Sequence, residues 1–564
     1  MRIYLVAIWL ILSGATIAQS HHDIYITELM PDPTPSVGLP AFEWIEIRNG
    51  TRQPIQLQQW RVGTNISLSG PFPFYWLAPD SLLILCSPAA LPSISLSGKA
   101  LAVTGFPLLD NDGTTVWLRH PSGSITHAVA YDKTWYGNSL KAEGGWSLEL
   151  VDQRWPCAGK NNWKSSTHAK GGTPGSANAT QDAQTTVPLP TVIHSYASAQ
   201  DSIRIQFSST IDSGWSVRAA LYKINNDIEV IAARTIDPLH TIVVCKLNRP
   251  LHADTIYSLT ITGIKSCHAP DIAGAITLPT GLASVCRPHD LVINEILFNP
   301  RAGGSDFVEL YNNSKKIIDL SSLYFTKRQA MGTLGSFIRL STTPRLLFPK
   351  EYVAFSSDPL LVAQQYLVRS PAHFFQITGF PTLPDNEGWL ILTDPQQIII
   401  DELHYNEDWH FPLLQEKEGV SLERINPNER TQSASNWHSA AQTEGFATPT
   451  RKNSQYRSDL KTAGFSVKTR LITPNLDGQD DFCVISYTTH EPGTLASVQI
   501  LDAAGRLVRM LATRTLLGSS GQWYWDGRDQ QGILLASANY LIVITHYTLK
   551  GAKTFYRFGV SLWR

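Results

Sequence analysis

The sequence is poor in charge and in methionine. Only 16% of its 564 residues are charged, 4 are methionine, and the formal net charge is −1. Low charge without a basic block argues against a nucleic-acid-binding chain, which needs clustered Lys and Arg. It also argues against a largely disordered chain. The 38 Gly, 34 Pro and 16 Trp favour turns and strands over helices. At roughly 100–200 residues per domain, we expect three to five domains.

Long apolar runs are lacking after the N-terminus. Residues 1–18 combine Arg2, an apolar run over 3–12 and a small-residue site ending at Ala18, which predicts a secretory signal peptide cut after Ala18. A membrane anchor is the alternative, but the run is shorter than the roughly 20 residues that a span needs. We therefore expect a soluble mature chain without a transmembrane span, secreted or held at the cell surface.

The 6 cysteines include no CxxC pair, so zinc-ribbon and thioredoxin-type chemistry are unsupported. A secreted location permits disulfides. Cys245, Cys267 and Cys286 lie in one segment, where we expect one bridge without assigning its pairing. Cys86 and Cys483 stand in strand-like apolar runs and are expected to be small buried residues.

An internal repeat organises the chain. TGFP occurs at 104–107 and again at 378–381, and the same offset places GGWSLELVD (144–152) on EGVSLERIN (418–426). Toward the N-terminus the offset falls by a few residues and places DIYITELMPDP on DLVINEILFNP. Drifting offsets are what loop insertions produce. The sequence therefore predicts a duplicated domain.

The two predicted copies occupy 22–178 and 289–453. Both contain strand-like alternations such as IYITEL, WIEIRN and FVELYN, separated at short intervals by NG, NDG and DNEG turns. No long 3.6-residue stripe with helix caps is present. We predict an all-β chain of tandem immunoglobulin-like β-sandwich domains.

The paired motifs ITEL/INEI, WIEI/FVEL and SLE, followed by NW and TP, resemble the lamin-tail domain. That domain is an immunoglobulin-like sandwich found in nuclear lamins and in many secreted bacterial proteins. The resemblance implies a bacterial secreted protein with two lamin-tail copies. It implies the fold of each copy and says little about function.

Two further segments differ from the repeat. Residues 185–287 alternate like strands, and their ending YSLTITGIKSCHAPDIAG is similar to bacterial Ig-like modules. Residues 464–564 resemble the Ig-like domain of flagellar hook-capping proteins, whose relatives close many secreted proteins of the Bacteroidetes type. TPNLDGQDDF resembles the gliding-motility-type C-terminal signature, although Leu476 stands where glycine is usual. This resemblance implies that the C-terminal domain addresses the chain to the type IX secretion machinery.

No HExxH, GxSxG, P-loop or GxGxxG motif is present. We therefore expect a non-enzymatic protein with an adhesion, scaffolding or envelope-attachment role, whose partner is an extracellular polymer or an envelope component. The alternative is a carbohydrate- or polymer-binding accessory protein to a separate hydrolase. A third hypothesis is a hydrolase that uses the pairs Glu28/Glu46 and Glu295/Glu309. These residues could equally be outward polar positions or buried acceptors for loop amides.

One segment has the ligand types of a metal site. Asn475, Asp477, Asp480 and Asp481 gather oxygen ligands around a glycine turn, which suits Ca²⁺. The alternative is a polar Asx-rich turn. No other cofactor is expected.

HYNEDWH (404–410) also carries potential metal ligands. In the first copy His404 and His410 become Ala130 and Tyr136, whereas the Tyr and Trp of the motif stay. The shared residues therefore indicate packing rather than metal binding.

Tryptophan faces can stack on sugars, but they also fill sandwich cores. Trp76, Trp155 and Tyr136 do not recur between the copies, so they are the candidate ligand platforms.

Overall fold

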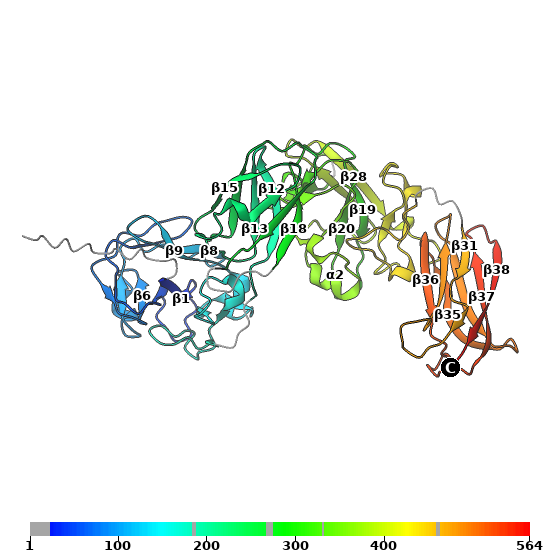
Figure 1. Ribbon diagram of the computed structural model, residues 1–564, viewed down its shortest axis with the longest axis horizontal. Coiled ribbons are helices and arrows are strands. Elements are labelled where there is room, and N and C mark those ends of the chain that lie inside the picture. Colours follow the sequence, from blue (N-terminus) through cyan, green and yellow to red (C-terminus); the bar gives the residue numbers. More distant parts are fainter. Residues whose placement is uncertain (1–22, 183–187, 267–273, 330–331, 458–462) are drawn as a thin grey trace, which may run out of the picture. The chain divides into compact units, whose positions relative to one another are not determined.

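The computed structural model describes all residues except 1–22, 183–187, 267–273, 330–331 and 458–462. The predicted signal peptide therefore lies outside the described residues. The described chain is built from strands, with only two short α-helices, α1 (Leu91–Ile94) and α2 (Pro359–Gln365) (Figure 1). The all-β prediction of tandem β-sandwich domains is confirmed. The chain divides into two compact units, one with residues up to 251 and 257–280, the other with 252–256 and 281–564.

The first copy packs two main sheets around an apolar core. The larger has the order β11-β10-β1-β2-β6-β7, and the smaller has the order β4-β8-β9. The strands are β1 (Ile24–Met30), β2 (Trp44–Asn49), β3 (Ile55–Gln56), β4 (Arg61–Gly63), β5 (Trp76–Leu77), β6 (Leu82–Cys86), β7 (Ala100–Ala102), β8 (Gly113–Arg119), β9 (Ile125–Asp132), β10 (Leu148–Leu150) and β11 (Trp163–Ser165). Trp60, Leu85 and Val116 are among the side chains buried between the sheets.

The second copy repeats this order and adds one edge strand, β23, to its smaller sheet. Its larger sheet runs β30-β29-β19-β20-β25-β26, and its second sheet runs β23-β22-β27-β28. The last pair of the larger sheet is parallel in both copies. The strands are β19 (Leu291–Leu297), β20 (Phe307–Asn312), β21 (Ile318–Asp319), β22 (Tyr324–Thr326), β23 (Ile338–Arg339), β24 (Leu346–Leu347), β25 (Tyr352–Ser356), β26 (Phe374–Gln376), β27 (Glu387–Thr393), β28 (Ile399–Asn406), β29 (Leu422–Arg424) and β30 (Trp437–Ser439).

The segment between the copies forms a smaller sandwich. One sheet has the order β12-β13-β16-β15 and the other β14-β17-β18. The strands are β12 (Val192–Ala199), β13 (Ser202–Phe207), β14 (Tyr222–Ile224), β15 (Val230–Thr235), β16 (Ile242–Leu247), β17 (Tyr257–Thr262) and β18 (Ala275–Thr280). Along β13 the buried residues Ile203, Ile205 and Phe207 alternate with half-buried polar ones, as expected of a strand with one face toward the core.

The C-terminal domain is a further sandwich, with sheets β31-β33-β36 and β32-β38-β37-β34-β35. The strands are β31 (Gly464–Val467), β32 (Leu471–Ile472), β33 (Cys483–Thr488), β34 (Leu495–Leu501), β35 (Leu507–Leu516), β36 (Ser520–Trp525), β37 (Ala538–Tyr547) and β38 (Lys553–Leu562). The tight turn expected at Ala504–Gly505 is confirmed between β34 and β35. Asp502 accepts backbone N–H groups there, and Gly505 has a φ of 79°.

The cysteines differ from expectation in one respect. Cys245 and Cys286 are buried free thiols. Any pairing among Cys245, Cys267 and Cys286 needs one of these two, so the expected bridge is wrong, although Cys267 itself lies outside the described residues. Cys157 is disulfide-bonded instead. Cys86 and Cys483 are free and fully buried, which confirms their assignment as small core residues.

Candidate functional site

Each copy gathers three glutamates at the centre of its larger sheet. On β1, Glu28 lies opposite Glu46 of β2 and opposite Glu149 of β10. All three side chains are fully buried. The same arrangement recurs in the second copy, with the equally buried residues Glu295, Glu309 and Glu423.

Sequence reasoning identified two members of each group and missed the third. Glu149 and Glu423 belong to the repeated SLE motif, so the alignment of the copies contained the signal. What the alignment could not show is that β10 and β29 lie beside the first strand of their copy.

In the first copy the three carboxylates accept N–H groups from the segment that closes the domain. The donors are the backbone nitrogens of Thr173 to Glu28 (2.8 Å), Gly175 to Glu46 (2.7 Å) and Thr180 to Glu149 (2.8 Å). The hydroxyl of Thr173 also bridges Glu28 and Glu149. The closing segment is thus fastened across three strands.

The second copy repeats these bonds. Backbone nitrogens donate from Thr448 to Glu295 (2.8 Å), from Thr450 to Glu309 (2.6 Å) and from Gln455 to Glu423 (2.7 Å). The hydroxyl of Thr448 again bridges two carboxylates, Glu295 and Glu423. We call the three glutamates of each copy, with the segment that donates to them, the carboxylate clamp.

An asparagine in each closing segment completes the clamp. The Asn178 side-chain amide donates to the carbonyls of Thr27 on β1 (2.9 Å) and Leu150 on β10 (2.8 Å). Asn453 does the same for Asn294 on β19 (2.8 Å) and Arg424 on β29 (2.9 Å). In both copies a side chain therefore bonds carbonyls of two neighbouring strands beyond the end of their short ladder.

Burial perturbs the acidity of these groups. It raises the pKa of Glu28 well above its ordinary value, and the neighbouring Glu46 and Glu149 carboxylates raise it further. Burial also raises the pKa of Glu46 to about 7, against the lowering effect of the bond from Gly175. In the second copy burial raises the pKa of Glu309 well above its ordinary value, with Glu295 adding to the effect.

This arrangement suits structure better than catalysis. Each clamp carboxylate is closed from solvent and occupied by donors of its own domain. A general acid or base must lie within hydrogen-bond reach of a substrate atom. The contacts are those of the alternative in which the glutamates are buried acceptors for loop amides.

The copies diverge beside the clamp. In the first, the backbone nitrogen of Ile26 donates to His127 Nδ1 (3.2 Å). In the second, the matching nitrogen of Ile293 donates to Asp401 Oδ2 (2.8 Å). Asp401 is ion-paired at 3.1 Å with the fully buried Arg424, whose counterpart in the first copy is a leucine. The equivalent backbone amide thus donates to an imidazole in the first copy and to a carboxylate in the second.

The predicted calcium ligands form a loop that bonds to itself. The carboxylate of Asp481 accepts the backbone nitrogens of Leu476 (2.7 Å) and Gly478 (2.9 Å). Asp477 accepts the Asn475 side-chain amide at 2.9 Å. These are the bonds of an Asx-rich turn. In the part of the chain that the structure describes, no three His, Cys, Asp or Glu side chains gather as a metal site. The backbone carbonyl of Asp480 accepts the backbone nitrogen of Thr473 (2.9 Å).

The potential metal ligands of the 404–410 segment contact separate neighbours. His404 stacks on Trp389, with ring centroids 4.2 Å apart. His410 is buried, its Nδ1 lies 2.9 Å from the Ser439 hydroxyl, and burial lowers its pKa to about 3. The carboxylate of Glu407 pairs with Lys417.

The three candidate platforms have different exposures. Trp76 on β5 is 54% exposed, Trp155 is half-buried, and Tyr136 is only 6% exposed. Tyr136 is therefore wrong as a platform, because it packs in the core of the first copy. The carbonyl of Trp155 accepts the Asn162 side-chain amide, which places this residue in the turn after β10.

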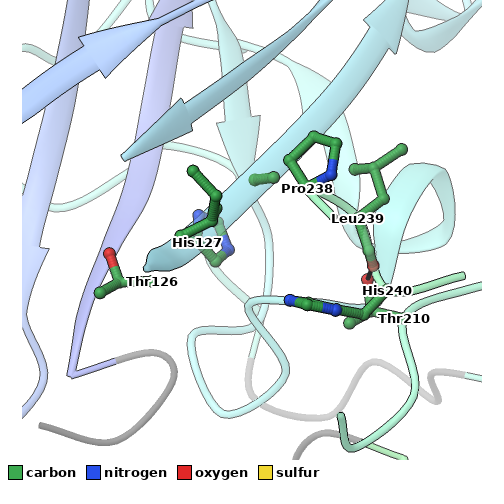
Figure 2. Close-up of a pocket in the computed structure, with 8 residues that line it drawn as sticks. Thr126, His127, Thr210, Pro238, Leu239 and His240 are labelled. Carbon is green, nitrogen blue, oxygen red and sulfur yellow. Dashed lines mark hydrogen bonds between the residues drawn. The ribbon is translucent and has the colours of Figure 1, made fainter. Parts of the chain in front are cut away.

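A cavity of about 10 Å³ is lined by Ile125–Ala128 of the first copy and by Thr210 and 238–240 (Figure 2). His127 and His240 line it together. Its volume is that of a single water position, so it cannot hold an organic ligand.

None of the helices in the described residues has both the length and the apolar composition needed to cross a bilayer.

The sheet topology and the buried cores define a protein of tandem β-sandwich domains. Residues 17–133 match the family model described as Lamin Tail Domain, so the chain contains one such domain there. The match ends at β9, before β10 and the closing segment that supply the rest of the first clamp. No curated protein matches the chain.

Solved structures with detectable similarity include bacterial surface proteins. The N-terminal part of the bacterial S-layer protein SbsC is 15% identical, with a TM-score of 0.16, covering 30% of this chain and 40% of that one. The S-layer protein rSbsC(31-844) is 11% identical, with a TM-score of 0.17, covering 67% of this chain and 55% of that one. A Ca²⁺-stabilized, ice-binding adhesin of an Antarctic bacterium is 8% identical, with a TM-score of 0.12, covering 96% and 100%. The chain thus spans about half or less of the two S-layer chains.

Proposed function

We propose that the chain is a non-enzymatic secreted or cell-surface protein whose sandwich domains serve adhesion, scaffolding or attachment to the envelope. One observation carries this proposal. The polar residues that both copies share, the clamp glutamates, are fully buried and hold the closing segment of each domain. Their role is to make a self-contained module, and tandem self-contained modules suit an extended extracellular protein.

The remaining domains fit this assignment. We assign 289–453 as a second lamin-tail domain because it has the sheet order and the clamp of the first copy. We assign 464–564 as a hook-capping-like Ig domain that acts as a type IX export address. Its two-sheet sandwich and the tight turn between β34 and β35 support that assignment.

Cell fractionation tests the assignment of the C-terminal domain. Full-length protein and a chain truncated after Ala463 would be expressed in the organism that supplies the gene. We expect full-length protein on the cell surface or in the medium, and the truncated chain in the periplasm. Export of both chains alike would contradict the address. Purified full-length protein that hydrolysed glycans, phosphoesters or nucleic acids would contradict the non-enzymatic role.

The second candidate function is polymer binding as an accessory to a separate hydrolase. Phe74 and Trp76 favour it, because they are 63% and 54% exposed and stand two residues apart near the β3–β5 pair. Aromatic faces of this kind stack on sugar rings. On a glycan array, Trp76→Ala should lose binding, while Trp563→Ala, which removes a tryptophan of 67% exposure from the C-terminal domain, should keep it. An array without hits would exclude this function.

A further inference from the structure

The middle sandwich carries a row of cationic side chains on the outer face of its four-stranded sheet. Cross-strand register places Arg204 of β13 opposite Val244 of β16, and Val244 opposite Arg234 of β15. Directly opposed residues project from the same face of a sheet. Tyr196 of β12 lies opposite Arg204, so an aromatic side chain adjoins the row on the fourth strand.

The two arginines lack partners in their own domain. Neither the Arg204 nor the Arg234 side chain forms a hydrogen bond or ion pair with any described residue, and the Arg204 Nε is buried without an acceptor. A guanidinium group without an acidic partner keeps its N–H donors for other acceptors, so the two arginines mark a place where ligand oxygens would be stabilised. The third cation, Lys246, is already ion-paired with Asp201.

Space for a ligand lies beside the row. A hollow of about 250 Å³ is lined by Arg234, Val244, Lys246, Ser202, Ala232 and Ala233. Apart from Arg234 and Lys246, these residues are small or apolar and form a floor between the cations. Arg204 and Arg234 are two strand spacings apart, roughly 10 Å between their backbones. The stacked rings of His194 and Tyr196, 5.8 Å between centroids, lie at the β12 end of the same face.

We propose that the outer face of the β12-β13-β16-β15 sheet binds an anionic polysaccharide, whose acidic groups pair with Arg204 and Arg234. Guanidinium groups recognise planar carboxylates and sulfates through two parallel hydrogen bonds. Two such groups on strands roughly 10 Å apart, with an aromatic pair at one end and a floor of small side chains, suit a chain of acidic sugars. The site deepens the proposed extracellular role and rests on it for its biological setting, since acidic polysaccharides coat cells outside the membrane.

The experiment uses the purified full-length protein and titration calorimetry with three polysaccharide probes and, as a fourth probe, duplex DNA. Polygalacturonate supplies carboxylates, dextran sulfate supplies sulfates, and unsubstituted dextran is neutral. We expect one or both polyanions to bind at about 0.15 M salt, more weakly at higher salt because of screening, and dextran not to bind. The stronger of the two polyanions identifies the acidic group.

Matched variants locate the binding. Arg234→Gln should weaken the Kd about tenfold, which corresponds to one lost charge-assisted contact, and Arg204→Gln/Arg234→Gln should weaken it further. Arg249→Gln removes the same charge from an exposed position of the same domain and should leave the Kd within twofold. Equal weakening by Arg249→Gln, tighter binding of duplex DNA than of either polyanion, or no binding by wild type would overturn the site.

The outcome is separable from that of the proposed function. Loss of polyanion binding by Arg204→Gln/Arg234→Gln in solution supports the site whether or not cells retain the protein. Normal surface display of a wild-type protein that binds no polyanion would overturn the site and leave the surface role standing.

Discussion

At the scale of single residues, a carboxyl that keeps its proton inside the fold makes stability depend on pH. Glu46 has a pKa of about 7 in the folded chain, raised by burial from an ordinary 4.5. Its favourable contribution is complete below the unfolded pKa and is lost as pH rises through the folded pKa. From this group alone the free energy of unfolding should fall by roughly 3 kcal/mol between those two values.

The test is the difference between wild type and Glu46→Gln, which cannot ionise. We expect hydrogen-exchange protection of β2 in full-length protein, corrected for intrinsic rates, to decline with rising pH in wild type and much less in the variant. Glu143→Gln, at an exposed position, should follow wild type. Parallel pH profiles for wild type and Glu46→Gln would show that Glu46 is ionised in the fold.

The buried ion pair beside the second clamp gives a second prediction. Arg424→Leu installs the residue of the first copy but leaves Asp401 buried and unpaired, which typically costs about 3–5 kcal/mol. Adding Asp401→His restores the pair of residues found in the first copy and should recover most of the loss. The loss and the recovery are both measured by urea denaturation, followed through the hydrogen exchange of β29. Arg430→Leu, at an exposed position, is the control, and a double variant no more stable than Arg424→Leu would contradict the equivalence.

The sequence predicted best the residues that are identical in the two copies, and least well the contacts between residues far apart in the chain. The duplicated glutamates Glu28 and Glu295 were found by alignment, but their partners in the closing segment lie about 145 positions or more away. Tyr136 was misjudged because a residue that is unique to one copy can still belong to the core. Cys157 was missed as a disulfide residue because closeness in the chain, the criterion used for Cys245 and Cys286, is not closeness in space.

At the scale of elements, one junction between strands in each larger sheet depends on a side chain. β1 and β10 are paired at only two positions, as are β19 and β29. Asn178 and Asn453 continue the connection by donating to a carbonyl on each strand. The strand order could be expected from the family resemblance, whereas this amide could not, because it arrives from a segment without regular structure.

Asn453→Ala should therefore loosen β29 and β30 before the rest of the second copy. It leaves two buried carbonyls without a donor, at about 1–3 kcal/mol each. We expect faster hydrogen exchange in β29 and β30 and little change in β27 and β28. Asn428→Ala, at an exposed position of the same domain, should change neither pair. Uniform acceleration over all four strands would argue for global unfolding rather than a local role.

At the scale of the whole molecule, the second clamp also contacts the C-terminal domain. The side-chain amide of Gln455 donates to the Leu517 carbonyl (3.2 Å), while its backbone nitrogen bonds Glu423. The backbone nitrogen of Ser519 donates to the Ser454 carbonyl (2.7 Å). One segment thus closes the second copy and contacts the turn between β35 and β36.

Gln455→Ala should accordingly affect both domains. We expect faster exchange in the β35–β36 turn as well as in β30, because the buried side-chain amide of Gln455 donates to the carbonyls of Ser439 on β30 and of Leu517 in the turn. Gln479→Ala, at an exposed position of the 475–481 loop, should affect neither. An effect confined to β30 would mean that the C-terminal domain is held by other contacts.

Tandem domains of one topology run the risk of exchanging strands while they fold. Here the two copies carry different buried residues at matching positions, His127 and Leu150 in the first and the ion pair of Asp401 with Arg424 in the second. A mixed domain that took β9 from the first copy and β29 from the second would bury Arg424 without a carboxylate. The reverse mixture would bury Asp401 without a cation. We infer that this divergence disfavours exchange of strands between the copies, because either mixed domain would leave a buried charge without its partner.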